Sequence, residues 1–86
     1  MRTAATLDLH GRPRPDAEAL VRNFVTTWHA RGGRAVVRIV TGKGMGSGGV
    51  PVLGPAVERL LATELRPLVS RWEPDAGGGA FFVKLR

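Results

Sequence analysis

The feature that most constrains the fold is an apolar stripe at helical spacing that is followed at once by a β-branched run. The stripe recurs every three to four residues, as on one face of an amphipathic helix, and consists of Ala17, Leu20, Val21, Phe24, Val25 and Trp28. Pro15 suits the first turn of this helix, and Gly32-Gly33 ends it. Residues 35–40 are apolar except for Arg38, which predicts a central strand covered on both faces. A helix followed by such a strand indicates a βαβ unit with parallel strands.

Two further elements are predicted, one before this helix and one after this strand. Residues 5–10 alternate between apolar and polar side chains and stop at Gly11, which predicts a first strand before the helix. A second helix is predicted from about Pro55, and Pro67 sets its end near Arg66, because the residue before a proline avoids the helical conformation.

The C-terminal third predicts a β-hairpin. Residues 68–72 and 80–85 are typical of strands, and the glycine-rich segment 75–79 predicts the turn that joins them. We therefore expect an α/β fold, a two-layer βαβαββ sandwich with a four-stranded mixed sheet and two helices. The length predicts one domain over residues 1–86, with a core from about residue 7 and a short N-terminal extension, 1–6.

Asp8 and His10 are the first candidate site residues. They are two residues apart in the predicted first strand, so their side chains share one face. A carboxylate and an imidazole together can orient a water, hold a divalent metal or move a proton. The carboxyl end of a strand is also the edge where open α/β sheets bind ligands. The alternative is that Asp8 caps the following loop while His10 is solvated or structural, and the pattern alone leaves both open.

The glycine-rich segment 41–49 is the second candidate. Backbone N–H groups without neighbouring side chains can cradle a phosphate, and Lys43 adds a positive charge. A Walker A loop is absent because Lys43 is followed by Gly44. Residues 44–49 fit G-x-G-x-x-G, but the chain is too short for a dinucleotide-binding fold. The alternative is a loop whose glycines only satisfy turn geometry.

The net charge of +6 favours a phosphate-rich partner. All but two of the 13 basic residues are arginines, whose guanidinium groups bind phosphate through two hydrogen bonds, although a GC-rich genome also enriches arginine. If the first two strands are parallel neighbours, the candidate residues meet at one edge. The predicted nucleic-acid contacts are Gly11, Arg12, Arg14, Thr41, Gly42, Lys43 and Gly44.

Other classes of protein are disfavoured by what the chain lacks. There is no cysteine, which excludes disulfides and cysteine-ligated zinc. No apolar run approaches the roughly 20 residues that cross a bilayer, and the N-terminus lacks the apolar core of a secretory signal. We expect a cytoplasmic monomer without a membrane partner.

Three short motifs together resemble the Smr (small MutS-related) domain family. Residues 7–11, LDLHG, are similar to its N-terminal signature, and residues 40–44, VTGKG, are similar to its central [HT]-G-x-G signature. Residues 77–80, GGGA, are similar to its C-terminal G-G-x-G-A element, one residue shorter. Each motif is weak alone, but they occur in the family's order, and the resemblance covers residues 7–86.

The resemblance implies a fold similar to the C-terminal domain of a bacterial translation initiation factor, and binding to DNA or RNA. It also implies a nicking or structure-specific endonuclease activity, with Asp8 and His10 at the positions most often tied to cleavage. Metal dependence varies in the family, so Mg²⁺ or Mn²⁺ is an expected cofactor, with Asp8 as its ligand. The chain departs from the family pattern at two positions. It has Thr41 where many members have His, and it has Gly46 near the place where many of the members with Thr have a His instead.

Three functions therefore remain open. In the leading hypothesis, an endonuclease, Asp8 binds a metal or orients water, His10 transfers a proton, and Lys43 stabilises the phosphoryl oxygens. The second is a nucleic-acid-binding module without catalysis. The third is a ribosome-associated or other protein-interaction domain, in which the charge only aids solubility.

Overall fold

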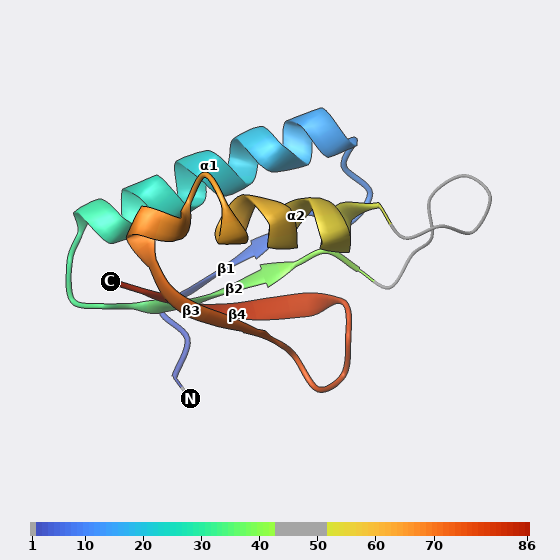
Figure 1. Ribbon diagram of the computed structural model, residues 1–86. Helices are drawn as coiled ribbons and strands as arrows, with labels where there is room; N and C mark the ends of the chain where they lie inside the picture. Colours follow the sequence, from blue (N-terminus) through green and yellow to red (C-terminus); the bar gives the residue numbers. More distant parts are fainter. Residues whose placement is uncertain (1, 43–51) are drawn as a thin grey trace.

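The computed structural model describes residues 2–42 and 52–86 (Figure 1). The elements, in chain order, are β1 (Ala5–Asp8), α1 (Arg14–Ala30), β2 (Val36–Val40), α2 (Leu53–Ala62), a short 3-10 helix η2 (Arg66–Leu68), β3 (Val69–Pro74) and β4 (Ala80–Leu85). This confirms the predicted βαβαββ order, with η2 as an addition. No helix in the described ranges has the length and hydropathy required to cross a membrane.

The four strands form one mixed sheet in the order β1-β2-β4-β3. β1 runs parallel to β2, while β4 runs antiparallel to both β2 and β3. Asp8 at the end of β1 lies opposite Val40 at the end of β2, and Val40 lies opposite Ala80 at the start of β4. The ends of the two parallel strands and the hairpin turn therefore share one edge of the sheet.

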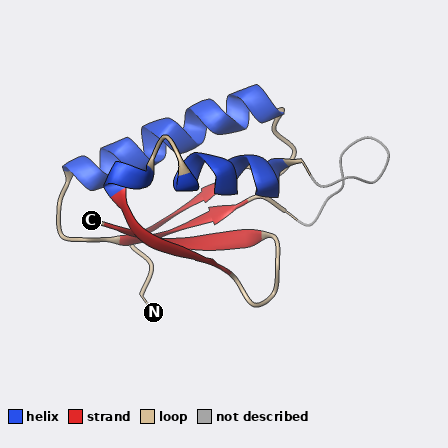
Figure 2. Ribbon diagram, in the orientation of Figure 1, coloured by secondary structure: helices blue, strands red, loops and turns tan. Residues whose placement is uncertain are grey.

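Both helices lie on the same face of the sheet, which gives two layers (Figure 2). In β2, Val37 and Ile39 are fully buried, whereas the alternating residues of this strand are half-buried. The expectation that this strand is covered on both faces was therefore wrong. On the open face, Arg38 lies over the Phe82 ring at 6.0 Å and forms an ion pair with Asp75 at 3.0 Å, so neighbouring strands supply the partial cover.

The core lies between the helices and the sheet. α1 contributes Ala17, Val21 and Val25, and α2 contributes Ala56, Val57, Leu60 and Leu61. Phe24 and Trp28 from the predicted stripe are half-buried and pack against this core. The stripe therefore has a fully buried centre and partly exposed flanks.

α2 ends at Ala62, four residues before the predicted end at Arg66. The Thr63 hydroxyl donates a hydrogen bond to the Arg59 carbonyl at 2.6 Å, and the Leu65 amide donates to the Leu60 carbonyl at 2.9 Å. These bonds close the helix and turn the chain, so that Leu65 is buried and Pro67 lies within η2. Pro67 sets only the latest possible end of the helix, which is why the sequence placed that end too late.

Candidate nucleic-acid interface

The first strand ends at Asp8, two residues earlier than the alternation predicted. Leu9 is fully buried, and its amide donates to the Val40 carbonyl at 2.7 Å. The chain then turns: the Arg12 amide donates to the Leu9 carbonyl at 3.0 Å, and Gly11 has a φ of +77° that favours glycine. His10 is therefore held on a tight turn rather than on the strand.

The Asp8 carboxylate is engaged by the backbone. Its Oδ1 accepts a hydrogen bond from the His10 amide at 2.9 Å. A side chain that bonds the backbone two residues on stabilises a turn, which matches the alternative in which Asp8 caps the loop. Both side chains are exposed. The carboxylate thus fixes the turn that presents the imidazole, and its second oxygen is the one left for other chemistry.

The His10 ring lies against Gly42, the first glycine of the glycine-rich segment. A Cβ built on Gly42 would lie 3.0 Å from Cδ2 of His10, tighter than most real Cβ contacts, so the ring would have to shift. Gly42 also has a φ of +82°. The backbone conformation and the contact with the ring therefore both favour glycine at this position. The end of the opening strand and the start of the glycine-rich segment meet, as the predicted parallel pairing required.

A third segment completes this junction. The amides of Thr41 and Gly42 both donate to the Gly79 carbonyl, at 2.8 and 2.9 Å. Gly79 belongs to the hairpin turn between β3 and β4, and its φ is +73°. No local pattern in the sequence predicts this contact, because it depends on the antiparallel register that sets Val40 opposite Ala80.

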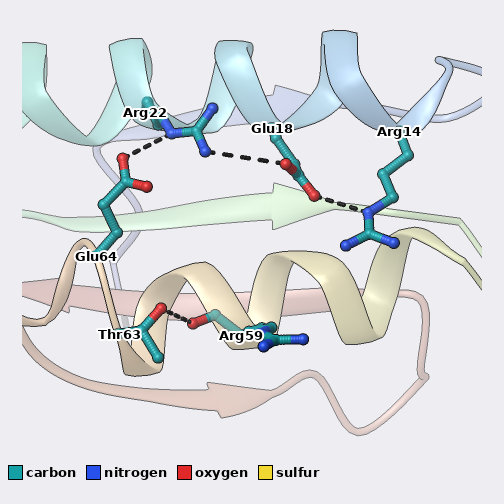
Figure 3. A network of polar contacts seen from close by, with 6 residues as sticks. All are labelled: Arg14, Glu18, Arg22, Arg59, Thr63 and Glu64. Carbon is teal, nitrogen blue, oxygen red and sulfur yellow. Dashed lines mark hydrogen bonds and ion pairs between the residues drawn. The ribbon is translucent and has the colours of Figure 1, made fainter.

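The two predicted arginines differ in their partners. Arg12 is exposed and forms no ion pair within the described residues. Arg14 forms an ion pair with Glu18 at 2.8 Å (Figure 3), and this hydrogen bond holds the pKa of Glu18 below its ordinary value. Arg14 also lines an open hollow of about 360 Å³ with Arg59 and the first turn of α2. The sequence offers no local signal for this proximity, because Arg14 and Arg59 lie on different helices.

Lys43 and Gly44 lie outside the described residues, so the structure assigns them no position. Within the ranges that are described, no three side chains of His, Asp or Glu come together as a metal-binding cluster. At the junction of these three segments, Asp8 and His10 are the described residues that carry a carboxylate and an imidazole.

Comparison with known proteins decides the family. The family model of the Smr domain matches residues 7–86. The chain belongs to the Smr domain family. A crystal structure of the human small-MutS related domain is similar to this Smr domain, with a TM-score of 0.71 and 27% identity over 93% of this chain and 99% of that chain. No curated protein matches the sequence. Smr domains are known in nucleic-acid-binding and nuclease-type proteins.

The three motifs of this Smr domain now have a shared structural explanation. The first covers the end of β1 and its turn, the second begins at the end of β2, and the third is the hairpin turn before β4. Residues far apart in sequence meet there through the Leu9–Val40 and Thr41–Gly79 hydrogen bonds and the His10–Gly42 contact. The motif residues that the structure describes therefore build one edge of the sheet.

Proposed function

We propose that this Smr domain binds the sugar-phosphate backbone of DNA or RNA at the motif edge and hydrolyses one of its phosphodiester bonds. We define the motif edge as the junction of His10, Arg12, Thr41, Gly42 and Gly79. The observation that carries the proposal is the exposed His10 imidazole, which is held on a turn against Gly42. Arg12, two residues later, forms no ion pair with any residue that the structure describes.

Binding follows from charge and backbone geometry. The chain carries a net charge of +6. Arg12 directly follows the turn at His10 and Gly11, and Arg14 is the first residue of α1. Guanidinium groups pair with phosphate oxygens and release condensed counterions, which makes such binding strongly salt-dependent. Lys43, proposed from the sequence alone, would add a cation next to Gly42.

Cleavage requires a group that moves protons. Hydrolysis removes a proton from the attacking water and delivers one to the leaving oxygen, and imidazole performs both near neutral pH. His10 is the exposed imidazole at this edge, and Asp8 positions it through the hydrogen bond to the backbone amide. If Mg²⁺ or Mn²⁺ bound here, the second Asp8 oxygen would be the carboxylate oxygen free to hold it, and the ion would supply charge stabilisation to the phosphoryl oxygens.

A second candidate function is binding without cleavage. Two observations favour it: Oδ1 of Asp8 is used by the His10 amide, and Thr41 stands where many family members have histidine. Under this alternative the same residues contact the backbone, but no bond is broken.

The cleavage test compares wild type with Asp8→Asn, Asp8→Ala and His10→Ala on supercoiled plasmid and structured RNA, with and without Mg²⁺ or Mn²⁺. His29→Ala is the matched control, since it removes the other histidine. We expect His10→Ala to abolish nicking and His29→Ala to retain it. Asparagine keeps an acceptor for the His10 amide but loses the charge. If Asp8→Asn keeps nicking activity and Asp8→Ala loses it, Asp8 acts by positioning His10. If both variants lose nicking activity, Asp8 acts as a metal ligand.

The binding test measures affinity for the same substrates over a salt series. The plot of log K against log salt should fall steeply for wild type, and Arg12→Gln should reduce the slope by about 1. Binding with no nicking in any protein selects the non-catalytic module. Absence of salt-dependent binding to either nucleic acid rejects the proposal and leaves a protein partner as the remaining class.

A further inference from the structure

A second basic hollow lies at the other end of the sheet from the motif edge. It is open, has a volume of about 480 Å³, and is lined by the end of α2, by η2 and by the first residues of β3. The side chains that give it chemical character are Arg66, Arg71, Arg86, Ser70 and Trp72. We call this set of residues the edge hollow.

The edge hollow is built by tertiary packing. The Arg86 amide donates to the Leu68 carbonyl at 3.0 Å, and Arg86 Nε donates to the Arg66 carbonyl at 3.4 Å, which joins the end of β4 to η2. A register shift between Val69 and Arg71 leaves Ser70 unpaired in the ladder with β4. β3 is an edge strand of the sheet, so the hollow opens at the side of the molecule.

The side chains that line the edge hollow carry a net positive charge. No acidic residue is among them, and none of the ion pairs within the described ranges involves Arg66, Arg71 or Arg86. The nearest acid along β3, Glu73, lines a small hollow on the open face of the sheet together with Arg71 and Trp72, so it offsets part of the charge of Arg71. The edge hollow therefore attracts an anion.

Trp72 gives the hollow an aromatic surface. It is half-buried, packs against the hydrophobic core, and lines the hollow with the part that remains accessible. A rigid indole beside arginines matches the pattern by which proteins bind single-stranded nucleic acid, with a base stacked on the ring and phosphates on the cations. A paired base in a duplex is already stacked between its neighbours, so the ring favours an unpaired one.

We propose that the edge hollow binds an unpaired nucleotide of the same nucleic acid that the motif edge holds, with the base on Trp72 and its phosphates on Arg66 and Arg86. The inference rests on the proposed function, because the motif edge supplies the first contact. α1 runs from the motif end to the opposite end of the molecule (Figure 1) and has 17 residues. At 1.5 Å per residue it spans about 25 Å, the length of about seven phosphates of a strand in B-form spacing. The substrate class is therefore nucleic acid with a single-stranded segment beside the contacted site.

The experiment uses the fluorescence of Trp72. Trp28→Phe removes the other tryptophan, and its circular dichroism establishes that it folds. The probe is an unstructured thymidine or uridine oligonucleotide of about 15 nucleotides, long enough to reach both ends given a span of about seven phosphates. We expect quenching that saturates with the binding curve measured by anisotropy of a labelled probe. Free thymidine monophosphate should quench only at much higher concentration, since it has no second contact.

Charge variants test the hollow without relying on tryptophan. Arg66→Gln with Arg86→Gln should lower the salt slope for the oligonucleotide by about 1.4, at about 0.7 per phosphate contact on a single strand. The matched control is Arg2→Gln with Arg34→Gln, which removes the same charge from exposed positions outside the hollow. It should change the slope by less than half as much.

The outcomes separate this inference from the proposed function. The inference is overturned if the anisotropy saturates while Trp72 fluorescence is unchanged, or if the two double variants have equal salt slopes. Either result leaves nicking by the motif edge standing. Absence of oligonucleotide binding together with absence of nicking overturns both. Loss of nicking in His10→Ala with Trp72 quenching retained supports two separate contacts.

Discussion

Gly42 and Gly33 have the same φ, +82°, but different surroundings. A Cβ on Gly42 would meet the His10 ring at 3.0 Å, whereas a Cβ on Gly33 would have no heavy atom within 4 Å. Alanine substitutions at these two glycines therefore separate two contributions to the free energy of unfolding: the left-handed backbone conformation and the contact with the His10 ring. At this scale, the position of the His10 ring depends on the space that the missing side chain of Gly42 leaves.

Gly33→Ala should therefore cost about 1 kcal/mol of unfolding free energy through its left-handed backbone alone, and Gly42→Ala about 1 kcal/mol more. Urea denaturation measures both values. The His10 ring resonances should also shift in Gly42→Ala and stay in place in Gly33→Ala. Equal costs and unmoved resonances would show that the ring makes no obligatory contact with Gly42.

At the scale of elements, the two helices are tied by a chain of surface ion pairs (Figure 3). Arg22 joins Glu18 of α1 at 3.9 Å and Glu64, just beyond α2, at 2.6 Å. The hydrogen bond to Glu64 raises the pKa of Arg22, so this guanidinium stays charged throughout. The Arg14 hydrogen bond lowers the pKa of Glu18 against the opposing effect of desolvation. The ion pair therefore holds the Arg14 side chain against its own helix.

The lowered pKa of Glu18 predicts an acid-dependent contribution to stability. A carboxyl whose pKa is lower in the folded state stabilises the fold above its unfolded pKa, and this is lost as pH falls through the folded value. Glu18→Gln should be less stable than wild type near neutral pH, by a small amount because the pair is exposed. The two proteins should converge well below about pH 4. Unfolding curves across pH test this, with Glu58→Gln as an exposed control; a pH-independent difference would contradict it.

At the scale of the whole molecule, one core supports two basic ends. The helices and strands that form the core also carry the motif edge at one end and the edge hollow at the other. A domain of 86 residues has a stability of about 4 to 13 kcal/mol, from 0.05 to 0.15 kcal/mol per residue. Neither end has a core of its own, so both should be lost together when the domain unfolds.

Leu61→Ala tests this dependence, because Leu61 is fully buried in α2. The cavity should cost about 2 to 5 kcal/mol, a large share of the total stability. Val52→Ala, at a position 40% exposed, is the control and should cost much less. Urea unfolding followed by Trp fluorescence and by circular dichroism should give one coincident transition in each protein. Separate transitions would contradict a single cooperative core.

The order of elements could be predicted from the sequence because it depends on local periodicity. The stripe from Ala17 to Trp28 predicted α1, the β-branched run predicted β2, and the hairpin with β4 at 80–85 was confirmed. The three motifs also indicated the family, which the match over residues 7–86 confirms. Lys43 and Gly44 stay predictions, and the chemical roles of Asp8 and His10 stay proposals.

The partners of individual groups were decided by tertiary structure. The alternation through His10 predicted a longer strand, yet the hydrogen bond from the His10 amide to Asp8 and the φ of Gly11 turn the chain. The Thr41–Gly79 contact and the edge hollow join residues that are dozens of positions apart. Periodicity records which face of an element is apolar, but only packing and strand register determine which distant groups meet.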